Sequence, residues 1–225
     1  MMQNYSDVTQ IGVDETSSKR GHNYISIFVD MAKSKVLFAT EGKGAETLSA
    51  FKQDLIAHKG KQEQIKDVCC DMSPAFIAGT EKTFPSAEIT FDKFHVLKII
   101  NEAVDEVRRQ EQKDCPVLKK TRFIWLKNAN GRTQKEEVTY RKLKDLNLKT
   151  IRAFHVKLNF QEFYNQPQET AEDFLKSWYF WATHSRLQPI IDAAKTIKRH
   201  WTGVLRWFKS KITNGVLEEK IDAKG

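Results

Sequence analysis

Near its N-terminus the chain has a short apolar run that ends on a carboxylate, and this pattern most restricts how the chain can fold. Residues 9–15 read Thr-Gln-Ile-Gly-Val-Asp-Glu, with Asp14 as the first acid. An ionised side chain inside a buried strand costs free energy, so an acid is expected only at the strand's end, where it faces a metal ion or water. Two later apolar runs, 65–70 and 87–91, are likewise followed by Asp71 and Asp92. Three strands that end on acids predict a polar site at one edge of a sheet.

The first third of the sequence predicts an α/β core. Residues 8–14, 24–29 and 36–40 are rich in strand-forming residues and are separated by short polar turns, as in antiparallel hairpins. Apolar residues then recur with helical period over 45–58, and Ser73-Pro74 predicts the start of a helix that runs to about residue 83. With strands at 65–70 and 87–91, the expected order is β-β-β-α-β-α-β, and the predicted core domain is 1–95.

After Asp92 the strand signals stop and helical periods follow. They cover 94–107, 117–126, 133–146, 151–163, 174–182 and 190–208, with a break expected near 200–203. Thr133 and Glu136 have the spacing of a capping box. We therefore expect a helical block over 96–212, followed by a final segment, 213–225, that returns to the core.

Basic residues are concentrated in part of this helical block. The whole chain has 37 Lys and Arg against 29 Asp and Glu, a formal net charge of +8. Between Lys113 and Phe160 there are 13 Lys and Arg against 4 Asp and Glu, so the local excess is 13 − 4 = +9 and the rest of the chain is about neutral. Such a block is typical of a polyanion-binding surface, and equally of a solvated helical face; charge alone leaves both open.

Several function classes are disfavoured. No apolar stretch approaches the roughly 20 residues that span a bilayer, and the N-terminus lacks the pattern of a signal peptide, which predicts a cytoplasmic protein. The three cysteines form no CxxC pair, and the six histidines show neither HxH nor HExxH spacing. Signatures of α/β-hydrolases, P-loop enzymes and dinucleotide-binding enzymes are absent from the sequence.

The acids could instead hold hard divalent cations, which prefer oxygen ligands. Asp14 and Asp71 are 71 − 14 = 57 residues apart, which leaves room for two strands and a helix. Each acid also has a simpler interpretation as a turn residue or helix cap. For Asp14 both interpretations stay open, whereas Asp71 favours the site because Ser73-Pro74 could cap the next helix without it. Asp30 is expected to serve a hairpin turn, and Asp92 is left open between strand end, cap and site.

Four segments together resemble a known family. They are Ile-Gly-Val-Asp-Glu at 11–15, Cys-Asp-Met-Ser-Pro-Ala-Phe at 70–76, Phe-Asp-Lys-Phe-His-Val at 91–96 and Thr-Asn-Gly-Val-Leu-Glu at 213–218. They are similar, in this order, to the catalytic domain of bacterial insertion-sequence transposases of the ISL-three family. This resemblance implies an RNase H-like mixed sheet with a large all-helical insertion before the last helix.

The resemblance also implies a DDE metal site that uses Mg²⁺ or Mn²⁺. Asp14 and Asp71 correspond to the two metal-binding aspartates, and Glu218 to the third carboxylate. Asp92 and His95 match the family's Asp-x-Phe-His segment and are candidates for accessory residues. The implied partner is DNA, both transposon ends and target, with a homodimer as the candidate assembly. Phosphate contacts are expected from the basic block, at Lys119, Lys120, Arg122, Arg141, Lys142 and Lys144.

Compared with the family pattern, the chain is expected to be shortened at both ends. The family's N-terminal zinc-binding and helix-turn-helix region has no counterpart before Asp14, and only residues 219–225 follow Glu218. The leading hypothesis is a DDE transposase catalytic domain that cuts and joins DNA strands with a metal ion. The alternative is a catalytically inactive remnant that only binds DNA through its basic helical block. A different RNase H-like nuclease, such as a junction resolvase, is disfavoured by the long helical insertion.

Overall fold

The computed structural model describes residues 3–17 and 24–212. The chain divides into two compact units, one formed by 1–96 with 202–225 and the other by 97–201. Among the described residues, no helix is both long enough and apolar enough to cross a membrane.

The first unit is built on a five-stranded mixed sheet with the strand order β3-β2-β1-β4-β5. Its strands are β1 (Gln10–Ser17), β2 (Tyr24–Asp30), β3 (Lys35–Glu41), β4 (Asp67–Cys70) and β5 (Glu88–Phe91). The first three strands pair antiparallel as a meander, whereas β4 pairs parallel with β1 and β5 pairs parallel with β4. The order β-β-β-α-β-α-β predicted from the sequence is confirmed, and with it the RNase H-like mixed sheet.

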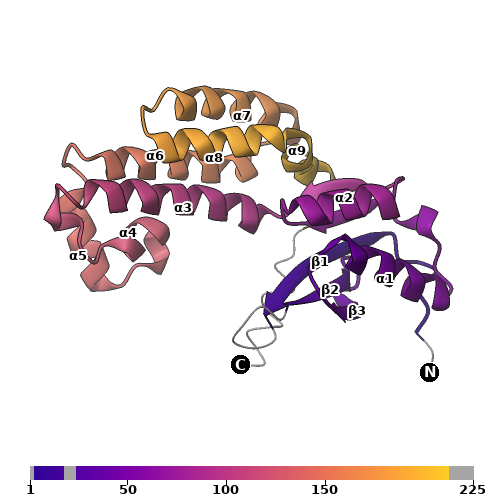
Figure 1. Ribbon diagram of the computed structural model, residues 1–225. Coiled ribbons are helices and arrows are strands. Elements are labelled where there is room, and N and C mark those ends of the chain that lie inside the picture. The colour runs from indigo at the N-terminus through magenta and orange to yellow at the C-terminus, as the bar shows by residue number, and fades with distance from the viewer. Residues whose placement is uncertain (1–2, 18–23, 213–225) are drawn as a thin grey trace. The chain divides into compact units, whose positions relative to one another are not determined.

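Two helices, α1 (Ala45–Ala57) and α2 (Pro74–Thr83), lie side by side against this sheet (Figure 1). Phe51 of α1 stacks on Phe28 of β2 with ring centroids 4.5 Å apart. The helices approach closely because Gly79 of α2 has no side chain: a Cβ there would lie 3.0 Å from the Cα of Ala45. A short 3-10 turn, η1 (Gln62–Gln64), precedes β4.

The hairpin turn between β2 and β3 is held by Asp30. Its Oδ1 accepts hydrogen bonds from the backbone N–H groups of Ala32 at 3.0 Å and Lys33 at 3.2 Å. Asp30 is buried, with 2% of its surface exposed. The structural role expected of this acid is therefore confirmed, and Asp30 is satisfied without a ligand.

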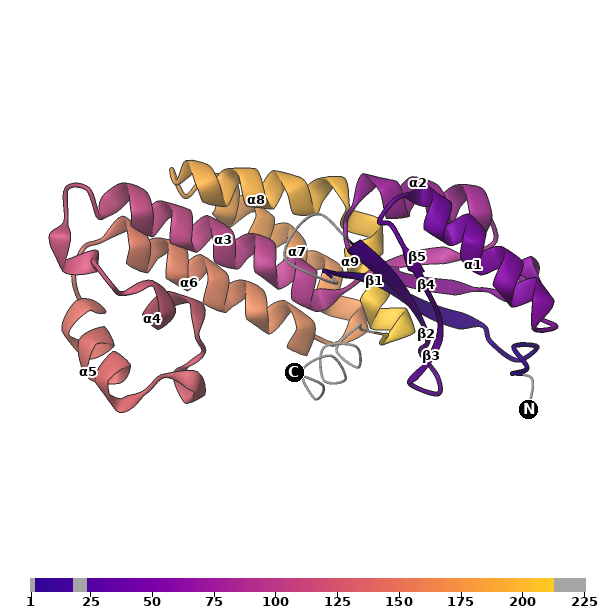
Figure 2. The same ribbon diagram turned by 60° about the horizontal axis from the view of Figure 1, so that its bottom comes forward.

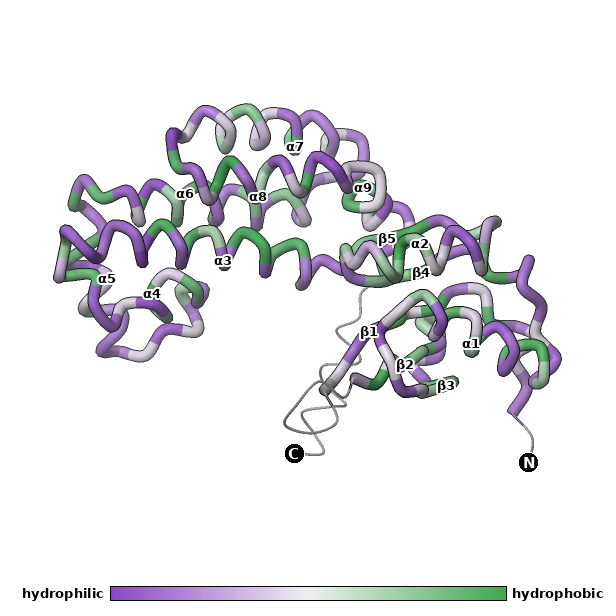
Figure 3. The backbone as a smooth tube through the Cα atoms, viewed as in Figure 1, coloured by the Kyte–Doolittle hydropathy of each residue, from purple (hydrophilic) through white to green (hydrophobic). Residues whose placement is uncertain are grey.

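The second unit is entirely helical over its described residues (Figure 2). It contains the end of α3 (Lys93–Glu111) and then α4 (Arg122–Leu126), α5 (Gln134–Leu143), α6 (Lys149–Gln161), α7 (Gln168–Thr183) and α8 (Gln188–Arg199). Three 3-10 turns, η2 (Pro116–Leu118), η3 (Ala129–Gly131) and η4 (Glu162–Asn165), join them. Hydrophobic and hydrophilic residues alternate along α3 and α8, as expected of amphipathic helices with one buried face (Figure 3).

Two polar contacts fix the helical unit. The capping box at Thr133 and Glu136 is present, with the Glu136 carboxylate accepting the Thr133 N–H at 2.8 Å, which confirms the prediction. Glu111, at the end of α3, accepts the N–H groups of Lys149 at 2.8 Å and Thr150 at 2.7 Å. One carboxylate therefore satisfies two unpaired donors at the start of α6 and ties α6 to α3.

The last described helix, α9 (Trp201–Ser210), returns to the sheet earlier than the sequence suggests. The sequence places this return at residue 213, whereas the first unit resumes at Thr202. Gly203 lies against the ring of Phe91, and Thr90 Oγ1 donates to Ser210 Oγ at 3.0 Å. Arg206 pairs with both Asp67, at 3.0 Å, and Glu88, at 2.5 Å. These long-range contacts show that α9 belongs to the first unit, although its apolar periodicity continues that of α8.

Candidate active site

Asp14 lies inside β1, and the expectation that it ends the strand is wrong. Strand β1 continues to Ser17, which pairs with Tyr24 of β2. The parallel pairing of β1 with β4, however, stops at Gly12 and Cys69. Asp14 therefore stands where β1 has lost its parallel neighbour but keeps its antiparallel one. This position gives the carboxylate an open side without ending the strand.

The register of the parallel strands brings three acids level with one another. In the β1–β4 pair, Gln10 is opposite Asp67, an offset of 67 − 10 = 57 that also separates Asp14 from Asp71. In the β4–β5 pair, Asp67 is opposite Glu88, an offset of 88 − 67 = 21 that also separates Asp71 from Asp92. The three aspartates thus occupy equivalent places at the carboxyl ends of the parallel pairings, where α/β sheets bind their ligands.

Asp14 is half-buried and surrounded by charge. Burial raises its pKa from the ordinary 3.8 to about 6, with further upward contributions from the negative charges of Asp92 and Asp71. The positive charge of His95 and a hydrogen bond from the Glu15 N–H, 2.8 Å from Asp14 Oδ1, act in the opposite direction. Electrostatic coupling to Asp71, Asp92 and His95 places all four groups in one cluster.

Asp71 also serves the turn that follows it. Its Oδ1 accepts the Ser73 N–H at 2.8 Å, just before α2 begins at Pro74. The side chain of Ser73 makes no capping hydrogen bond, so the expectation that Ser73 caps α2 without help from Asp71 is wrong. The short polar side chain of Asp71 reaches the backbone two residues on and closes the turn itself. One carboxylate oxygen is used in this way.

Asp92 and His95 form a pair beside the two aspartates. Asp92 is buried, with 1% of its surface exposed, and its Oδ2 lies 3.2 Å from His95 Nδ1 in the first turn of α3. The hydrogen bond to Asp92 raises the pKa of His95, and the charges of Asp14 and Asp71 add to this shift against the effect of burial. The two accessory candidates therefore belong to the same cluster as Asp14 and Asp71.

The third predicted carboxylate, Glu218, lies outside the described residues. Within 3–17 and 24–212, no three His, Cys, Asp or Glu side chains form a ready-made metal site. Helix α9, which packs on β5 next to this cluster, ends at Ser210, eight residues before Glu218 in the sequence (218 − 210 = 8).

The residues present are suited to a divalent cation. Asp14 is desolvated and repelled by two neighbouring acids, and His95 and the Glu15 N–H compensate its ionised form only in part, because the pKa stays raised. A hard cation such as Mg²⁺ relieves this repulsion and prefers carboxylate oxygens, keeping water or phosphate oxygens in its remaining positions.

The predicted DNA-binding residues all lie in the helical unit and are exposed. Two of them are already paired: Arg122 Nε is 3.3 Å from Asp105 Oδ2, and Arg141 Nε is 3.1 Å from Glu137 Oε1. Among the described residues, no ion-pair partner is found for the other four, Lys119, Lys120, Lys142 and Lys144.

One lysine of the basic block does not contribute to a surface. Lys157 is 1% exposed, and its Nζ donates to the carbonyl oxygens of Trp125 at 2.9 Å and Leu126 at 2.6 Å. Lys157 therefore adds no charge to the exposed surface of the basic block at 113–160. The helical period of α6 does not by itself show which face is buried. The structure shows that Lys157 lies on the buried face.

The RNase H-like sheet, with aspartates level where its parallel pairings end and a helical unit inserted after them in the sequence, is the arrangement that the resemblance to DDE transposases implied. A family model described as a transposase, of the DDE class and ISL3 type, matches residues 11–220. The chain belongs to this family of ISL3-type DDE transposases, as the four segments indicated.

Individual relatives agree with this assignment. The transposase of insertion sequence element IS1001 from Bordetella parapertussis is 27% identical over 224 residues, covering 95% of this chain and 54% of that protein. The transposase of IS1557 from Mycobacterium tuberculosis is 23% identical over 242 residues, with the same two coverages of 95% and 54%. The chain therefore spans about half the length of these relatives.

Solved structures similar to this one include two integrase cores. The catalytic core domain of HTLV-2 integrase, in complex with magnesium, is 17% identical and aligns over 64% of this chain and 91% of its own, with a TM-score of 0.30. The catalytic core domain of BIV integrase is 13% identical and aligns over 71% of this chain and 99% of its own, with a TM-score of 0.29. At these scores the alignments carry no argument about function.

Proposed function

We propose that the first unit is the metal-dependent catalytic part of this transposase, which cleaves DNA strands and joins them to a target. One observation carries the proposal: Asp14 and Asp71 stand level on adjacent strands, two residues past the point where the parallel pairing of β1 with β4 ends. The raised pKa of Asp14 supports it, because a desolvated acid beside other acids is typical of a site that operates with a bound cation.

In this proposal Asp14 and Asp71 hold Mg²⁺ or Mn²⁺, and Glu218 is the third ligand. A bound divalent ion supplies an activated attacking oxygen and stabilises the leaving oxygen of the phosphodiester. The chain's own contribution is to fix the two aspartates. Asp14 is fixed by its place inside β1 and by the Glu15 N–H, and Asp71 by its hydrogen bond from the Ser73 N–H.

We assign Asp92 and His95 a positioning role. Asp92 is too deeply buried to meet a DNA strand directly, and it holds His95 through a 3.2 Å contact. The raised pKa of His95 favours its protonated, positively charged form next to Asp14 and Asp71. The pair therefore offsets part of the negative charge that accumulates where the DNA phosphate and the two aspartates meet.

The helical unit supplies the DNA contacts in this proposal. Its exposed lysines, Lys119, Lys120, Lys142 and Lys144, are suited to phosphate oxygens of the backbone, which contribute affinity without reading sequence. Such contacts make binding depend steeply on salt concentration.

The test is strand cleavage of supercoiled DNA with Mg²⁺ or Mn²⁺, followed as nicking over time. Asp14→Asn and Asp71→Asn are expected to reduce metal-dependent nicking to the background while leaving DNA binding intact. The matched control is Asp114→Asn, an exposed acid of the helical unit, which is expected to cleave like the wild type. Undiminished cleavage by either aspartate variant contradicts the proposal. Wild-type protein that binds DNA but never cleaves it supports the alternative of a DNA-binding remnant.

A further inference from the structure

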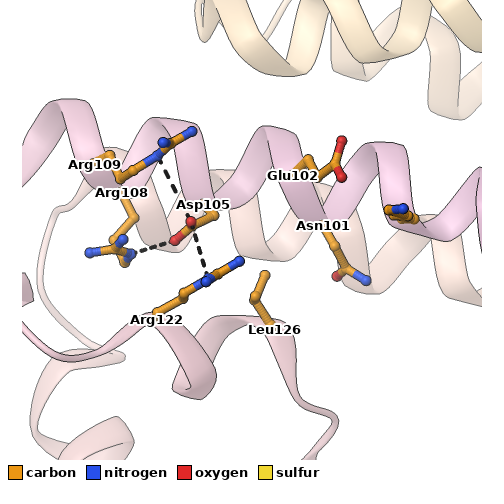
Figure 4. A pocket seen from close by; sticks show the side chains of 8 residues that line it. Asn101, Glu102, Asp105, Arg108, Arg109, Arg122 and Leu126 are labelled. Carbon is orange, nitrogen blue, oxygen red and sulfur yellow. Dashed lines mark hydrogen bonds and ion pairs between the residues drawn. The ribbon is translucent and has the colours of Figure 1, made fainter. Parts of the chain in front are cut away.

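The helical unit contains an open pocket of about 610 Å³ between α3 and α4 (Figure 4). It is lined by Lys98, Asn101, Glu102 and Asp105 of α3 and by three arginines, with Leu126 at its edge. The arginines are Arg108 and Arg109 from α3 and Arg122 from α4. Four cations face two carboxylates, so the lining has a formal charge of 4 − 2 = +2.

The three arginines converge on one acid. Arg108 Nε is 2.7 Å from Asp105 Oδ1, while Arg122 Nε at 3.3 Å and Arg109 Nε at 3.8 Å share Oδ2. In Figure 4 this cluster occupies one end of the pocket, and Asn101 and Glu102 lie further along α3. The positive charge is therefore concentrated at the arginine end.

The Asp105 carboxylate does not engage all the N–H donors of these three guanidinium groups. Each arginine turns its Nε edge toward the carboxylate. Arg108 also donates Nη1 to Gln112 at 2.7 Å, and Arg109 pairs with Glu106 on its own helix. The Nη groups of Arg122 make no hydrogen bond to the described part of the chain, and its ion pair with Asp105 is made through Nε. An unused guanidinium edge matches the two oxygens of a phosphate in bidentate geometry.

A structural clamp between the two helices explains only part of this arrangement. Joining α4 to α3 requires the Arg122–Asp105 pair alone. Arg108 is also buried there, with 7% of its surface exposed, and burial of its charge costs desolvation free energy. It shares the Asp105 carboxylate with Arg122, so one negative charge offsets two positive charges incompletely. A second anion in the pocket would balance the charge.

An exposed aromatic ring beside the arginines indicates what kind of anion this is. Phe123 has 57% of its surface exposed, directly after Arg122 in α4. The Arg122 guanidinium carbon is 5.8 Å from the ring centroid, and Lys127 Nζ is 5.7 Å from it. Aromatic side chains flanked by cations are typical of surfaces that hold a nucleic-acid strand, where the cations contact the phosphates.

We propose that the pocket formed by Arg108, Arg109 and Arg122 binds a backbone phosphate of a DNA strand next to Phe123. The inference rests on the proposed function, because it takes DNA as the partner, and it adds two residues, Arg108 and Arg109, outside the basic block. Arg108 holds the pocket's floor, while Arg109 and Arg122 contact the phosphate.

The experiment measures binding of the full chain to a short fluorescein-labelled DNA duplex at several salt concentrations. For each phosphate contact, the slope of log affinity against log salt is about −0.9 for duplex DNA. Arg109→Gln with Arg122→Gln removes both contacts to the one phosphate, so it is expected to make this slope shallower by about 1 and to weaken binding roughly tenfold at physiological salt. Arg199→Gln is the control, an exposed arginine of α8 that bonds Thr196 of its own helix, and is expected to bind like the wild type.

Two single variants separate recognition from folding. Both ion-pair partners of Arg109, Asp105 and Glu106, are on α3, so Arg109→Gln leaves the α3–α4 contact in place. It is expected to make the slope shallower, by less than the double variant does. Arg122→Lys keeps a positive charge near Asp105 but loses the bidentate edge, so it is expected to bind more weakly than the wild type at an almost unchanged slope.

The outcomes distinguish this inference from the proposed function. A double variant with wild-type affinity and slope overturns the phosphate pocket and leaves the catalytic proposal standing. Wild-type protein that does not bind the duplex at all contradicts both. Displacement of the duplex by deoxyadenosine monophosphate at micromolar concentration would assign the pocket to free nucleotides and would also overturn the inference.

Discussion

Asp14 and Asp71 lie level with each other on adjacent parallel strands, each two residues past the paired residues Gly12 and Cys69. Their charges interact, and burial already pushes Asp14 toward its protonated form. Two acids so placed are stable together only if one of them carries a proton or a cation lies beside them. The competition between proton and cation at Asp14 gives the first two predictions.

Asp14→Asn is expected to be more stable than the wild type at pH 7 when divalent ions are removed. The pKa of Asp14 is raised from 3.8 to about 6, so between these values the folded protein binds more protons than the unfolded chain. Below about pH 4 Asp14 is protonated in both states and does not lower the free energy of unfolding. As pH rises through about 6, ionisation of Asp14 lowers this free energy by at most about 3 kcal/mol. Urea unfolding in EDTA at several pH values measures the difference, and a difference that does not change with pH would refute this explanation.

Adding Mg²⁺ or Mn²⁺ is expected to raise the melting temperature of the wild type. A ligand that binds only the folded state stabilises it by about 2.7 kcal/mol at 100 times its Kd. Asp14→Asn and Asp71→Asn are expected to lose this response, whereas the exposed acid variant Asp114→Asn is expected to keep it. Equal metal-induced shifts in all four proteins would show that the ion binds elsewhere.

Gly203→Ala is expected to weaken the attachment of α9 to the sheet. A Cβ at Gly203 would lie 2.4 Å from Phe91 Cε2 and 3.3 Å from the carbonyl oxygen of Ile89. Overpacking of this kind costs about 1–3 kcal/mol, against which a gain of about 1 kcal/mol in helix propensity acts. Gly131→Ala is the control, because its Cβ would meet only the Cβ of Lys127, at 3.9 Å. Chemical denaturation measures both; equal stability of the two variants would contradict close packing at Gly203.

Lys157→Met is expected to destabilise the helical unit by about 1–3 kcal/mol, because it leaves the carbonyls of Trp125 and Leu126 without donors. Burial lowers the pKa of Lys157 from 10.5 to about 8. Between these values the unfolded chain binds more protons, so this residue's contribution to stability rises with pH across that window. Lys135→Met, at an exposed position, is the control in thermal unfolding, and a loss equal to that of Lys157→Met would contradict the role of the buried amine.

The sheet could be predicted from the sequence because its signals are local. Strand-forming residues and short polar turns mark β1 to β3, and helical periods mark α1 and α2. Asp14 and Asp71 lie opposite each other because of the register in which β1 pairs with β4. Their separation of 57 residues in the sequence allows this register but does not require it. For this reason Asp14 was expected at a strand end, although antiparallel pairing with β2 carries β1 on to Ser17.

Contacts between residues far apart in the sequence could not be predicted. Helix α9 continues the apolar period of α8, and long-range contacts such as the pairing of Arg206 with Asp67, 139 positions away, show that it belongs to the core. Arg122 is expected from the sequence to contact DNA, but nothing in the sequence indicates that it also pairs with Asp105 of a different helix. Such ion pairs depend on tertiary packing, which leaves no periodic pattern in the sequence.

The most direct test of the central claim is the position of Mn²⁺ in crystals of the wild-type protein, located by anomalous diffraction. We expect one ion in contact with the carboxylate oxygens of both Asp14 and Asp71, and no such peak in crystals of Asp71→Asn grown and soaked in the same way. An ion bound elsewhere, or none near these two aspartates at saturating Mn²⁺, would contradict the assignment of Asp14 and Asp71 as metal ligands.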